Sequence, residues 1–143
     1  MKTLRNALVL SVLTLAGLTV PAPHARADVT IDFDTYAAVA YSPATGKYGY
    51  AWNHRSRYLA ERAALSKCPA ADARVVGWVK GGWLVLAVGD NNAYGTGWEY
   101  GVGATNVDAY KRALRQCLAR ANKVVTVVVL CSGNVAPRVL HND

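Results

Sequence analysis

The sequence predicts a single α+β domain of two tandem ββαβ repeats, which form a mainly antiparallel sheet packed by two helices. Three observations support this fold class. Residues 36–80 align with residues 83–131 as an internal repeat. Each of these stretches has two short apolar runs, an amphipathic helical stretch and a third apolar run. The junction between them is Gly81-Gly82, which is a turn and not a linker, so the two repeats belong to one domain.

The repeat is visible at the level of single residues. Tyr48-Gly-Tyr-Ala-Trp52 matches Tyr94-Gly-Thr-Gly-Trp98 at an offset of 46 residues, and the helical segments and the strands after them match at an offset of 49. A three-residue insertion near residues 99–103 explains the change in offset. The duplication predicts one topology for both halves and one shared hydrophobic interior.

The strands follow from apolar runs and turn formers. Residues 36–41 and 83–88 are short apolar runs that end in the turn-forming stretches 43–46 and 89–92, so each is expected to begin a hairpin. Residues 123–130 are apolar at nearly every position, which is typical of a strand covered on both faces. We expect this strand in the centre of the sheet, and we expect Gly81-Gly82 to join the two repeats as a further hairpin.

Two amphipathic stretches predict the helices. The second has apolar residues at i, i+3, i+4, i+7, i+8 and i+11, the spacing of one buried stripe: Tyr110, Ala113, Leu114, Cys117, Leu118 and Ala121. The first has a stripe of smaller residues, so it can lie close to the sheet: Ala60, Ala64, Leu65 and Cys68. Thr105 with Asp108 is a better capping box than Ser56 with Leu59, so the first helix is expected to fray more readily.

Residues 1–27 have the three parts of a cleavable signal peptide: a positive start, an apolar run over 7–20 and the cleavage site Ala25-Arg26-Ala27. The alternative is a membrane anchor, but a spanning helix needs about 20 apolar residues, and this run is shorter and ends at Pro21. We therefore expect residues 28–143 to form the mature domain, secreted or extracytoplasmic in the cell envelope, with no transmembrane segment left after cleavage.

Charge excludes one class of partner. Loss of Lys2, Arg5 and Arg26 with the signal lowers the formal net charge from +7 to +4, a mildly basic balance that favours weak attraction to anionic envelope polymers. The sequence has no run of five or more like charges, so a nucleic-acid partner is not expected.

Three cysteines leave one unpaired in an exported chain. Subtracting the 49-residue offset from Cys117 and Cys131 gives Cys68 and Gly82, so the first repeat keeps the helix cysteine but has glycine in place of its partner. The sequence therefore predicts a Cys117–Cys131 disulfide and a free, buried Cys68.

Candidate catalytic and metal-binding residues are few. The mature chain has two histidines, His54 and His141, and the second is in the C-terminal tail, so we expect neither a metal site nor a cofactor. Glu61 and Glu99 are candidates for a carboxylate pair that hydrolyses glycans, but nothing in their spacing brings them together. No catalytic residue is assigned from the sequence.

Aromatic residues are the most informative excess. Twelve of the thirteen lie between Tyr36 and Tyr110, and many are next to glycine. Tyr and Trp combine a large contact area with a polar group, which suits binding surfaces. The alternative is that aromatic pairs across hairpins stabilise the sheet. The candidate binding residues are Tyr48, Tyr50, Trp52, Tyr94, Trp98 and Tyr100.

The order of these motifs, a Tyr36-Ala-Ala-Val-Ala-Tyr41 strand, a Gly-aromatic hairpin, a helix with Cys68 at its end and a Val-Val-Gly-Trp strand, all repeated, resembles a family of small secreted bacterial domains, domain of unknown function 4189. The resemblance extends over residues 36–132. It implies export and a compact α+β fold, and it supplies no catalytic residues. Members of this type often carry a cysteine where this chain has Gly82.

The leading hypothesis is a non-catalytic secreted interaction module that presents its Gly-aromatic hairpins to a protein or a cell-envelope glycan. Two alternatives stay open: a small extracytoplasmic hydrolase built around Glu61, Glu99 or His54, and an inhibitor or immunity protein for an exported toxin. The sequence does not indicate the oligomeric state.

Overall fold

The computed structural model describes residues 34–101 and 104–142. The predicted signal peptide, residues 1–27, lies outside these residues. The elements follow the order β1 (Tyr36–Tyr41), β2 (Tyr48–His54), α1 (Arg57–Ser66), β3 (Arg74–Lys80), β4 (Gly82–Gly89), β5 (Tyr94–Tyr100), α2 (Asn106–Leu118), β6 (Val124–Cys131) and β7 (Arg138–His141). The predicted α+β class is confirmed.

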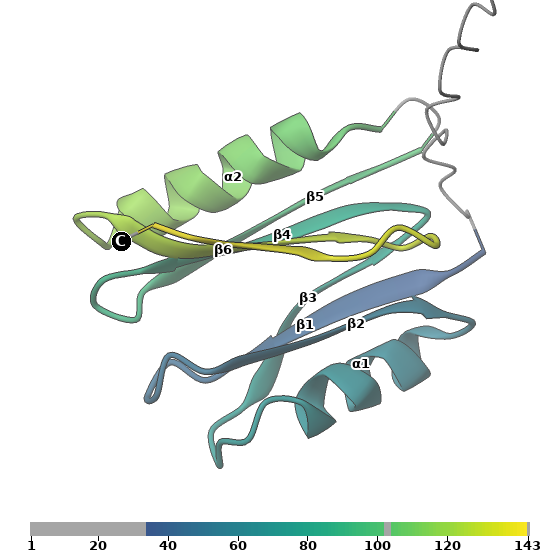
Figure 1. Ribbon diagram of the computed structural model, residues 1–143, viewed down its shortest axis with the longest axis horizontal. Helices are drawn as coiled ribbons and strands as arrows, with labels where there is room; N and C mark the ends of the chain where they lie inside the picture. Colours follow the sequence, from purple (N-terminus) through teal and green to yellow (C-terminus); the bar gives the residue numbers. More distant parts are fainter. Residues whose placement is uncertain (1–33, 102–103, 143) are drawn as a thin grey trace, which may run out of the picture.

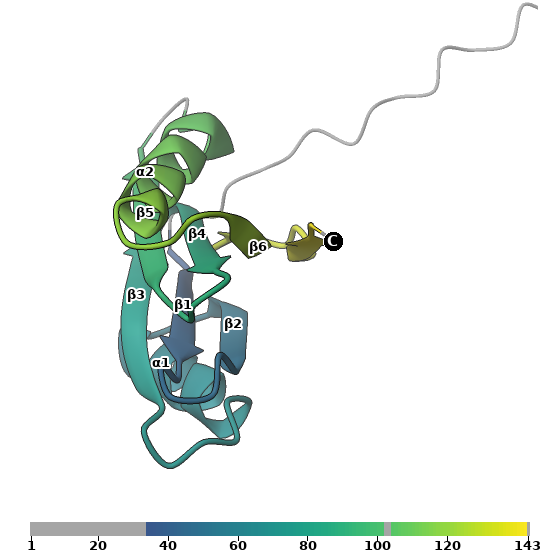
Figure 2. The ribbon, with the colours of Figure 1, turned by 90° about the vertical axis from the view of Figure 1, so that its left-hand side faces the viewer.

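The strands form two antiparallel sheets and not one. The first has the order β2-β1-β3 and the second the order β5-β4-β6-β7. The sheets face each other, α1 covers the outer face of the first and α2 the outer face of the second, so the domain has four layers (Figure 1). Figure 2 shows β3 and β5 together at one edge of this sandwich, with β2 and β6 toward the opposite edge.

The predicted hairpin at Gly81-Gly82 is wrong, although the turn is present. Strand β4 pairs with β5 on one side and β6 on the other, so neither of its edges is open to β3. Gly81 has a φ of +60°, a left-handed conformation that glycine adopts without strain, and the chain passes there from the first sheet to the second.

The main core lies between the two sheets. Buried side chains from β1, β4 and β6 alternate along each strand and meet in this layer; the largest are Val39, Tyr41, Leu84, Leu86, Val128 and Leu130. The residues between them face a helix on the outer side of their sheet. Burial on both faces explains why β6 is apolar at nearly every position, and its predicted interior place is confirmed.

Small residues bring each helix close to its sheet. Ala60 and Ala64 of α1 pack on the alanines of β1 and β2, and Ala109 and Ala113 of α2 pack on the second sheet. A Cβ atom added at Gly97 of β5 would lie 1.9 Å from the carbonyl oxygen of Ala109. The backbones of α2 and β5 are therefore in contact with no side chain between them.

The two helix starts differ from the prediction. Ser56 Oγ accepts a hydrogen bond from the Leu59 amide at 3.2 Å, whereas Thr105 makes no side-chain capping bond. The shorter helix α1 thus has the better N-cap.

Strand β7 is short, with four residues, and the sequence does not predict it, since it lies in the C-terminal tail. It pairs antiparallel with β6, with Val139 opposite Val128 and His141 opposite Thr126. Thr126 Oγ1 and His141 Nδ1 are 3.2 Å apart, within hydrogen-bond distance. His141 is therefore an ordered part of the second sheet.

The predicted Cys117–Cys131 disulfide is not formed. All three cysteines, each in the described part of the chain, are free and buried. Cys117 lies near Gly89, which pairs with the first residue of β6, whereas Cys131 ends β6 opposite Trp83. The length of β6 separates the two thiols, roughly 23 Å at a rise of about 3.3 Å per residue. The two cysteines are only fourteen residues apart in the sequence, but the whole of β6 lies between them.

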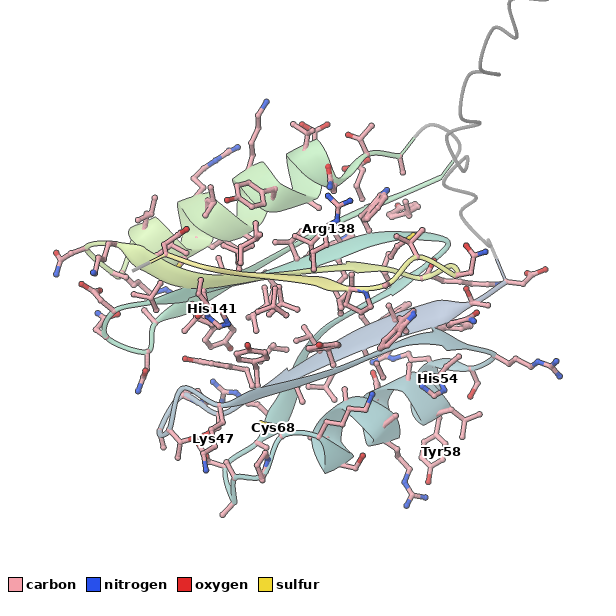
Figure 3. The ribbon with its side chains drawn as sticks, viewed as in Figure 1. Lys47, His54, Tyr58, Cys68, Arg138 and His141 are labelled. Atoms are coloured by element: carbon pink, nitrogen blue, oxygen red, sulfur yellow. The ribbon has the colours of Figure 1, made fainter. Side chains whose placement is uncertain are left out.

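Each thiol on a helix end contacts a loop carbonyl. The Cys68 Sγ–Lys47 O distance is 3.4 Å, and Figure 3 shows the two residues close together. The Cys117 Sγ–Ala93 O distance is 3.6 Å. Burial raises the pKa of all three thiols, which keeps them protonated at neutral pH.

We expect Ellman's reagent to detect three thiols per chain in denaturant without reductant, because the structure contains three free cysteines. In the native protein the reaction should be slow, since the reagent needs an exposed thiolate. One thiol per chain in denaturant would instead show that two cysteines are bonded.

Candidate functional site

Four of the six aromatic residues predicted to bind a ligand pack between the sheets. Tyr48, Tyr50 and Trp52 of β2 and Tyr94 of β5 are half-buried against the main core. The ring centroids of Tyr94 and Tyr41 are 5.0 Å apart, and those of Tyr50 and Trp52 are 6.2 Å apart. These rings therefore pack between the two sheets or along one strand, and not as the pairs across a hairpin that the alternative expected.

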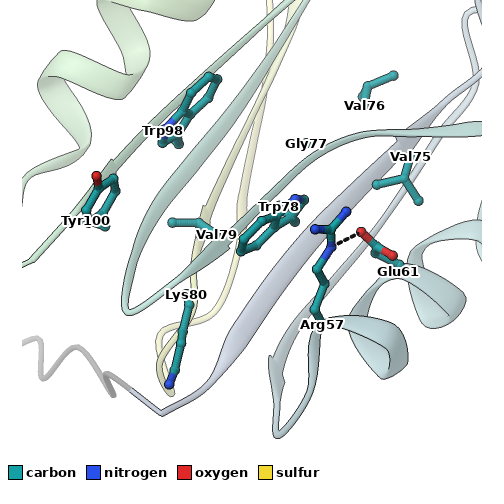
Figure 4. Close-up of a pocket in the computed structure, with 10 residues that line it drawn as sticks. All are labelled: Arg57, Glu61, Val75, Val76, Gly77, Trp78, Val79, Lys80, Trp98 and Tyr100. Carbon is teal, nitrogen blue, oxygen red and sulfur yellow. Dashed lines mark hydrogen bonds and ion pairs between the residues drawn. The ribbon is translucent and has the colours of Figure 1, made fainter.

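The other two, Trp98 and Tyr100, are exposed. The exposed fraction is 41% for Trp98 and 69% for Tyr100. Both line a groove of about 760 Å³, shown in Figure 4. Its remaining walls come from β3 and α1: Val75, Val76, Gly77, Trp78, Val79 and Lys80 of β3, with Arg57 and Glu61 of α1.

The groove lies where one edge of each sheet meets the other. Strand β3 ends the first sheet and β5 ends the second, and the two strands are in contact. Trp98 is opposite Leu84 of the main core, so it is on the inner face of its sheet. Trp78 is opposite Ala38, which faces α1, so it is on the outer face. The Trp98 ring thus reaches the groove from the layer between the sheets, and the Trp78 ring reaches it from the outer face of the first sheet (Figure 4).

An arginine from α1 covers one indole. The guanidinium carbon of Arg57 lies 4.3 Å from the Trp78 ring centroid. Arg57 Nε donates to Glu61 Oε1 at 2.6 Å (Figure 4). Stacking and the ion pair restrict the arginine from two sides, although each such contact at a partly exposed site contributes only about 0.5–1 kcal/mol. Arg57 therefore covers the Trp78 ring on the side away from Trp98 and Tyr100 (Figure 4).

A second basic residue lies at the far end of β3. Lys80 Nζ is 3.4 Å from Asp34 Oδ1 and 5.6 Å from the Tyr36 ring centroid. The two cations that line the groove, Arg57 and Lys80, thus each lie beside a carboxylate, and most of the remaining lining is apolar.

The residues of the hydrolase hypothesis are not brought together. Glu61 lines the groove, where it is paired with Arg57. Glu99 Oε2 lies 3.7 Å from the guanidinium of Arg112 on α2. His54 pairs with Tyr36 on the side of β1 away from β3, and it does not line the groove.

The described residues contain no group of three or more His, Cys, Asp or Glu side chains that could hold a metal ion. Neither α1 nor α2, the helices of the described ranges, is long and apolar enough to cross a bilayer.

Trp78 and Arg57 were missed as site residues. The Val-Val-Gly-Trp run around Trp78 has the composition of a strand, and its exposure of 39% arises because β3 is at an edge. One signal was present: β3 carries Gly77 and two charged ends, whereas β6 is a continuous apolar run. That difference is typical of an edge strand beside a central one.

Comparison with protein families gives one finding. The family model described as Domain of unknown function (DUF4189) matches residues 36–131, which include every residue that lines the groove. Comparisons with curated proteins and with solved structures give no match.

Proposed function

The chain belongs to the DUF4189 family, and we propose that it is a secreted, non-catalytic binding module whose ligand occupies the groove formed by Trp78, Trp98 and Tyr100. One observation carries this proposal: three exposed aromatic side chains from two sheets converge on one groove. Large, rigid aromatic side chains around an apolar depression are the usual anchors of a binding surface. The ligand is a protein or a cell-envelope glycan.

Export is part of the proposal. It is supported by the n-region, apolar run and cleavage motif of residues 1–27. A module released from the cell would meet envelope polymers and other exported proteins, and its mildly basic charge favours anionic ones.

We also propose that the domain arose by tandem duplication of a ββαβ unit. Three similarities between the halves support this. The orders β2-β1-β3 and β5-β4-β6 correspond. The added Cβ atoms at Gly49 and Gly95 would meet a helix carbonyl at 2.3 and 2.2 Å. The thiol contacts of Cys68 and Cys117 go to equivalent loops.

The registers refine the sequence alignment of the last strand. Tyr36 is opposite Lys80, and Trp83 is opposite Cys131. Lys80 is therefore the positional counterpart of Cys131, an offset of 51 residues in place of the 49 read from the sequence. Gly82, which the alignment had paired with Cys131, belongs to β4.

The proposal is tested by Trp98→Ala, with Trp52→Ala as the matched control. Trp52 holds the corresponding place in the other repeat but packs against the main core. The purified protein is screened against soluble peptidoglycan fragments and a phage-displayed heptapeptide library, and affinities are measured by calorimetry. We expect Trp98→Ala to weaken a recovered ligand at least about tenfold, the size of a modest hot spot. Trp52→Ala should leave the affinity within about twofold.

Two results would contradict the proposal. If Trp52→Ala abolished binding and Trp98→Ala did not, the ligand surface would be on the β1–β2 hairpin. If neither substitution changed the affinity of any recovered ligand, the groove would have no part in recognition.

The hydrolase hypothesis has one observation in its favour, which is the presence of Glu61 in the groove. Its carboxylate accepts a hydrogen bond from Arg57 Nε at 2.6 Å, so it is already engaged within α1, and among the described residues no second carboxylate lines the groove as a partner for it. Loss of a turnover activity in Glu61→Gln, with ligand affinity retained, would establish the enzyme in place of the binding module.

A further inference from the structure

We infer that the groove takes an extended polypeptide segment, which adds to the free edge of β3 as an antiparallel strand. This inference rests on the proposed function, since it specifies the ligand class and the binding mode of the same groove. Strand addition of this kind draws affinity from backbone hydrogen bonds and specificity from alternate side chains.

The backbone of β3 is open along the groove. Within residues 34–101 and 104–142, β1 is the only strand that pairs with β3. Six consecutive residues of β3, from Val75 to Lys80, line the groove. One of the seven β3 residues is buried, whereas six of the eight β6 residues are. The edge of β3 thus offers unpaired backbone groups beside an apolar depression.

The second sheet shows what covers the equivalent edge. Strand β6 has β4 on one side and β7 on the other. The register makes Gly77 and Trp78 of β3 the counterparts of Val128 and Val129 of β6, because each pair lies opposite the same two positions of its central strand. Val128 and Val129 are the residues that pair with β7, through Val139 and Arg138. The groove therefore lies where the first sheet lacks a strand corresponding to β7.

The side chains around the edge specify an alternating segment. A residue opposite Gly77 would point between the sheets toward Trp98, as Val139 of β7 points toward the main core. Gly77 contributes no side chain there, and Leu84 Cδ1 of the main core lies 3.0 Å from the position that a Cβ would take. An apolar side chain of the segment would therefore pack beside Leu84. The next residue of the segment would lie beside Trp78 and the Arg57 head group on the outer face. Alternation of apolar and polar residues is thus expected.

The basic residues at the two ends of β3 favour acidic residues at the two ends of the bound segment. Strand β3 begins at the exposed Arg74 and ends at the exposed Lys80. Acidic residues at both ends of the bound strand would meet these cations. A glycan could stack on the indoles, but its hydroxyl groups do not repeat at the spacing of the backbone groups of a strand, so the open edge favours a polypeptide.

The probe is a capped peptide, Asp-Val-Thr-Val-Thr-Val-Asp, which has the predicted alternation and acidic ends. Two control peptides separate the steps of the argument. One carries N-methyl groups on alternate amides, which removes backbone donors and keeps every side chain. The other, Asp-Thr-Val-Val-Val-Thr-Asp, has the same composition without the alternation. Binding to the full chain is followed by tryptophan fluorescence, and hydrogen exchange is measured along β3.

We expect the alternating peptide to bind and to slow amide exchange in residues 74–80. Its affinity should fall at least tenfold on N-methylation and at least fivefold in the non-alternating peptide. Trp98→Ala and Tyr100→Ala should each weaken its binding, whereas Trp52→Ala should not. Circular dichroism spectra and melting curves of the variants establish that they are folded.

Other outcomes separate this inference from the proposed function. If the N-methylated peptide bound as well as its parent, with Trp98→Ala weakening both, the groove would bind ligands but not by strand addition. If only peptidoglycan fragments bound there, the polypeptide class would be wrong while the binding module stood. A concentration-dependent dimer that protects β3 and excludes the peptide would identify a second copy of the chain as the occupant, which would overturn the inference. Binding of neither peptides nor glycans would overturn both proposals.

Discussion

Replacing Gly97 by alanine is expected to lower the free energy of unfolding by about 3 kcal/mol or more, the upper end of the usual cost of overpacking. The added Cβ would lie 1.9 Å from the carbonyl oxygen of Ala109 and 2.9 Å from the Ala113 amide nitrogen. Both atoms belong to the backbone of α2, so no side-chain rotation can relieve the contact. The helix must move away from β5, and the buried layer between α2 and the second sheet loses its packing. Urea unfolding measures the change.

Gly77→Ala is the matched control, because Gly77 is also a strand glycine with a negative φ. Its added Cβ would meet Leu84 Cδ1 at 3.0 Å, the end of a flexible side chain. We expect a loss of no more than about 1 kcal/mol, within the range for tolerated core changes. Equal unfolding midpoints for the two variants would show that α2 does not lie against β5 as described.

Alkaline pH is expected to destabilise the protein through Tyr41, with a loss of about 2 kcal/mol between pH 10 and pH 12. Tyr41 is fully buried, and its hydroxyl donates to the Asn92 carbonyl oxygen at 2.9 Å. Burial, followed by the charges of neighbouring thiol and phenol groups, raises its pKa from 10.0 to about 12. Between these values the unfolded chain releases a proton that the folded chain keeps. The contribution of Tyr41 to the free energy of unfolding is therefore fully present below pH 10 and is lost as the pH rises through 12.

Tyr41→Phe separates this titration from other alkaline effects. The variant loses the bond to Asn92, about 1 kcal/mol at neutral pH, and it cannot ionise at this position. Its free energy of unfolding should fall less steeply above pH 10 than that of the parent. The buried thiols, whose pKa values are also raised, contribute a decline in the same direction to both proteins. Parallel profiles from urea unfolding at pH 7 to 12 would exclude Tyr41 as the cause.

The strands and helices were largely predictable, but their partition into two sheets was not. Continuous apolar runs locate β1, β4 and β6, because these strands are buried on both faces and the runs of β1 and β4 end in turn formers. Whether two successive strands pair depends on distant partners. The chain turns at Gly81 into a second sheet because β5 and β6 occupy both edges of β4. No feature near residue 81 carries that information.

The same limit explains why the sequence did not separate the exposed aromatic residues from the packed ones. The motifs Tyr48–Trp52 and Tyr94–Trp98 are nearly equivalent in sequence, yet Trp52 packs against the main core while Trp98 is exposed at the groove. The difference arises because Trp98 is on β5, which lies beside the edge strand β3, whereas Trp52 is on β2, which lies beside β6. The Cys117–Cys131 pairing failed for a related reason, since sequence distance does not reveal that a strand carries the second cysteine to the opposite end of the sheet.

The single residue between β3 and β4 makes the two halves dependent on one another. Only Gly81 separates Lys80 from Gly82, and each half presents one apolar sheet face to its neighbour. A fragment that ended at this junction would keep its helix and three strands but would expose the whole inner layer to water. We therefore expect neither half to fold alone, and complementation of two such fragments would require them to associate as they fold.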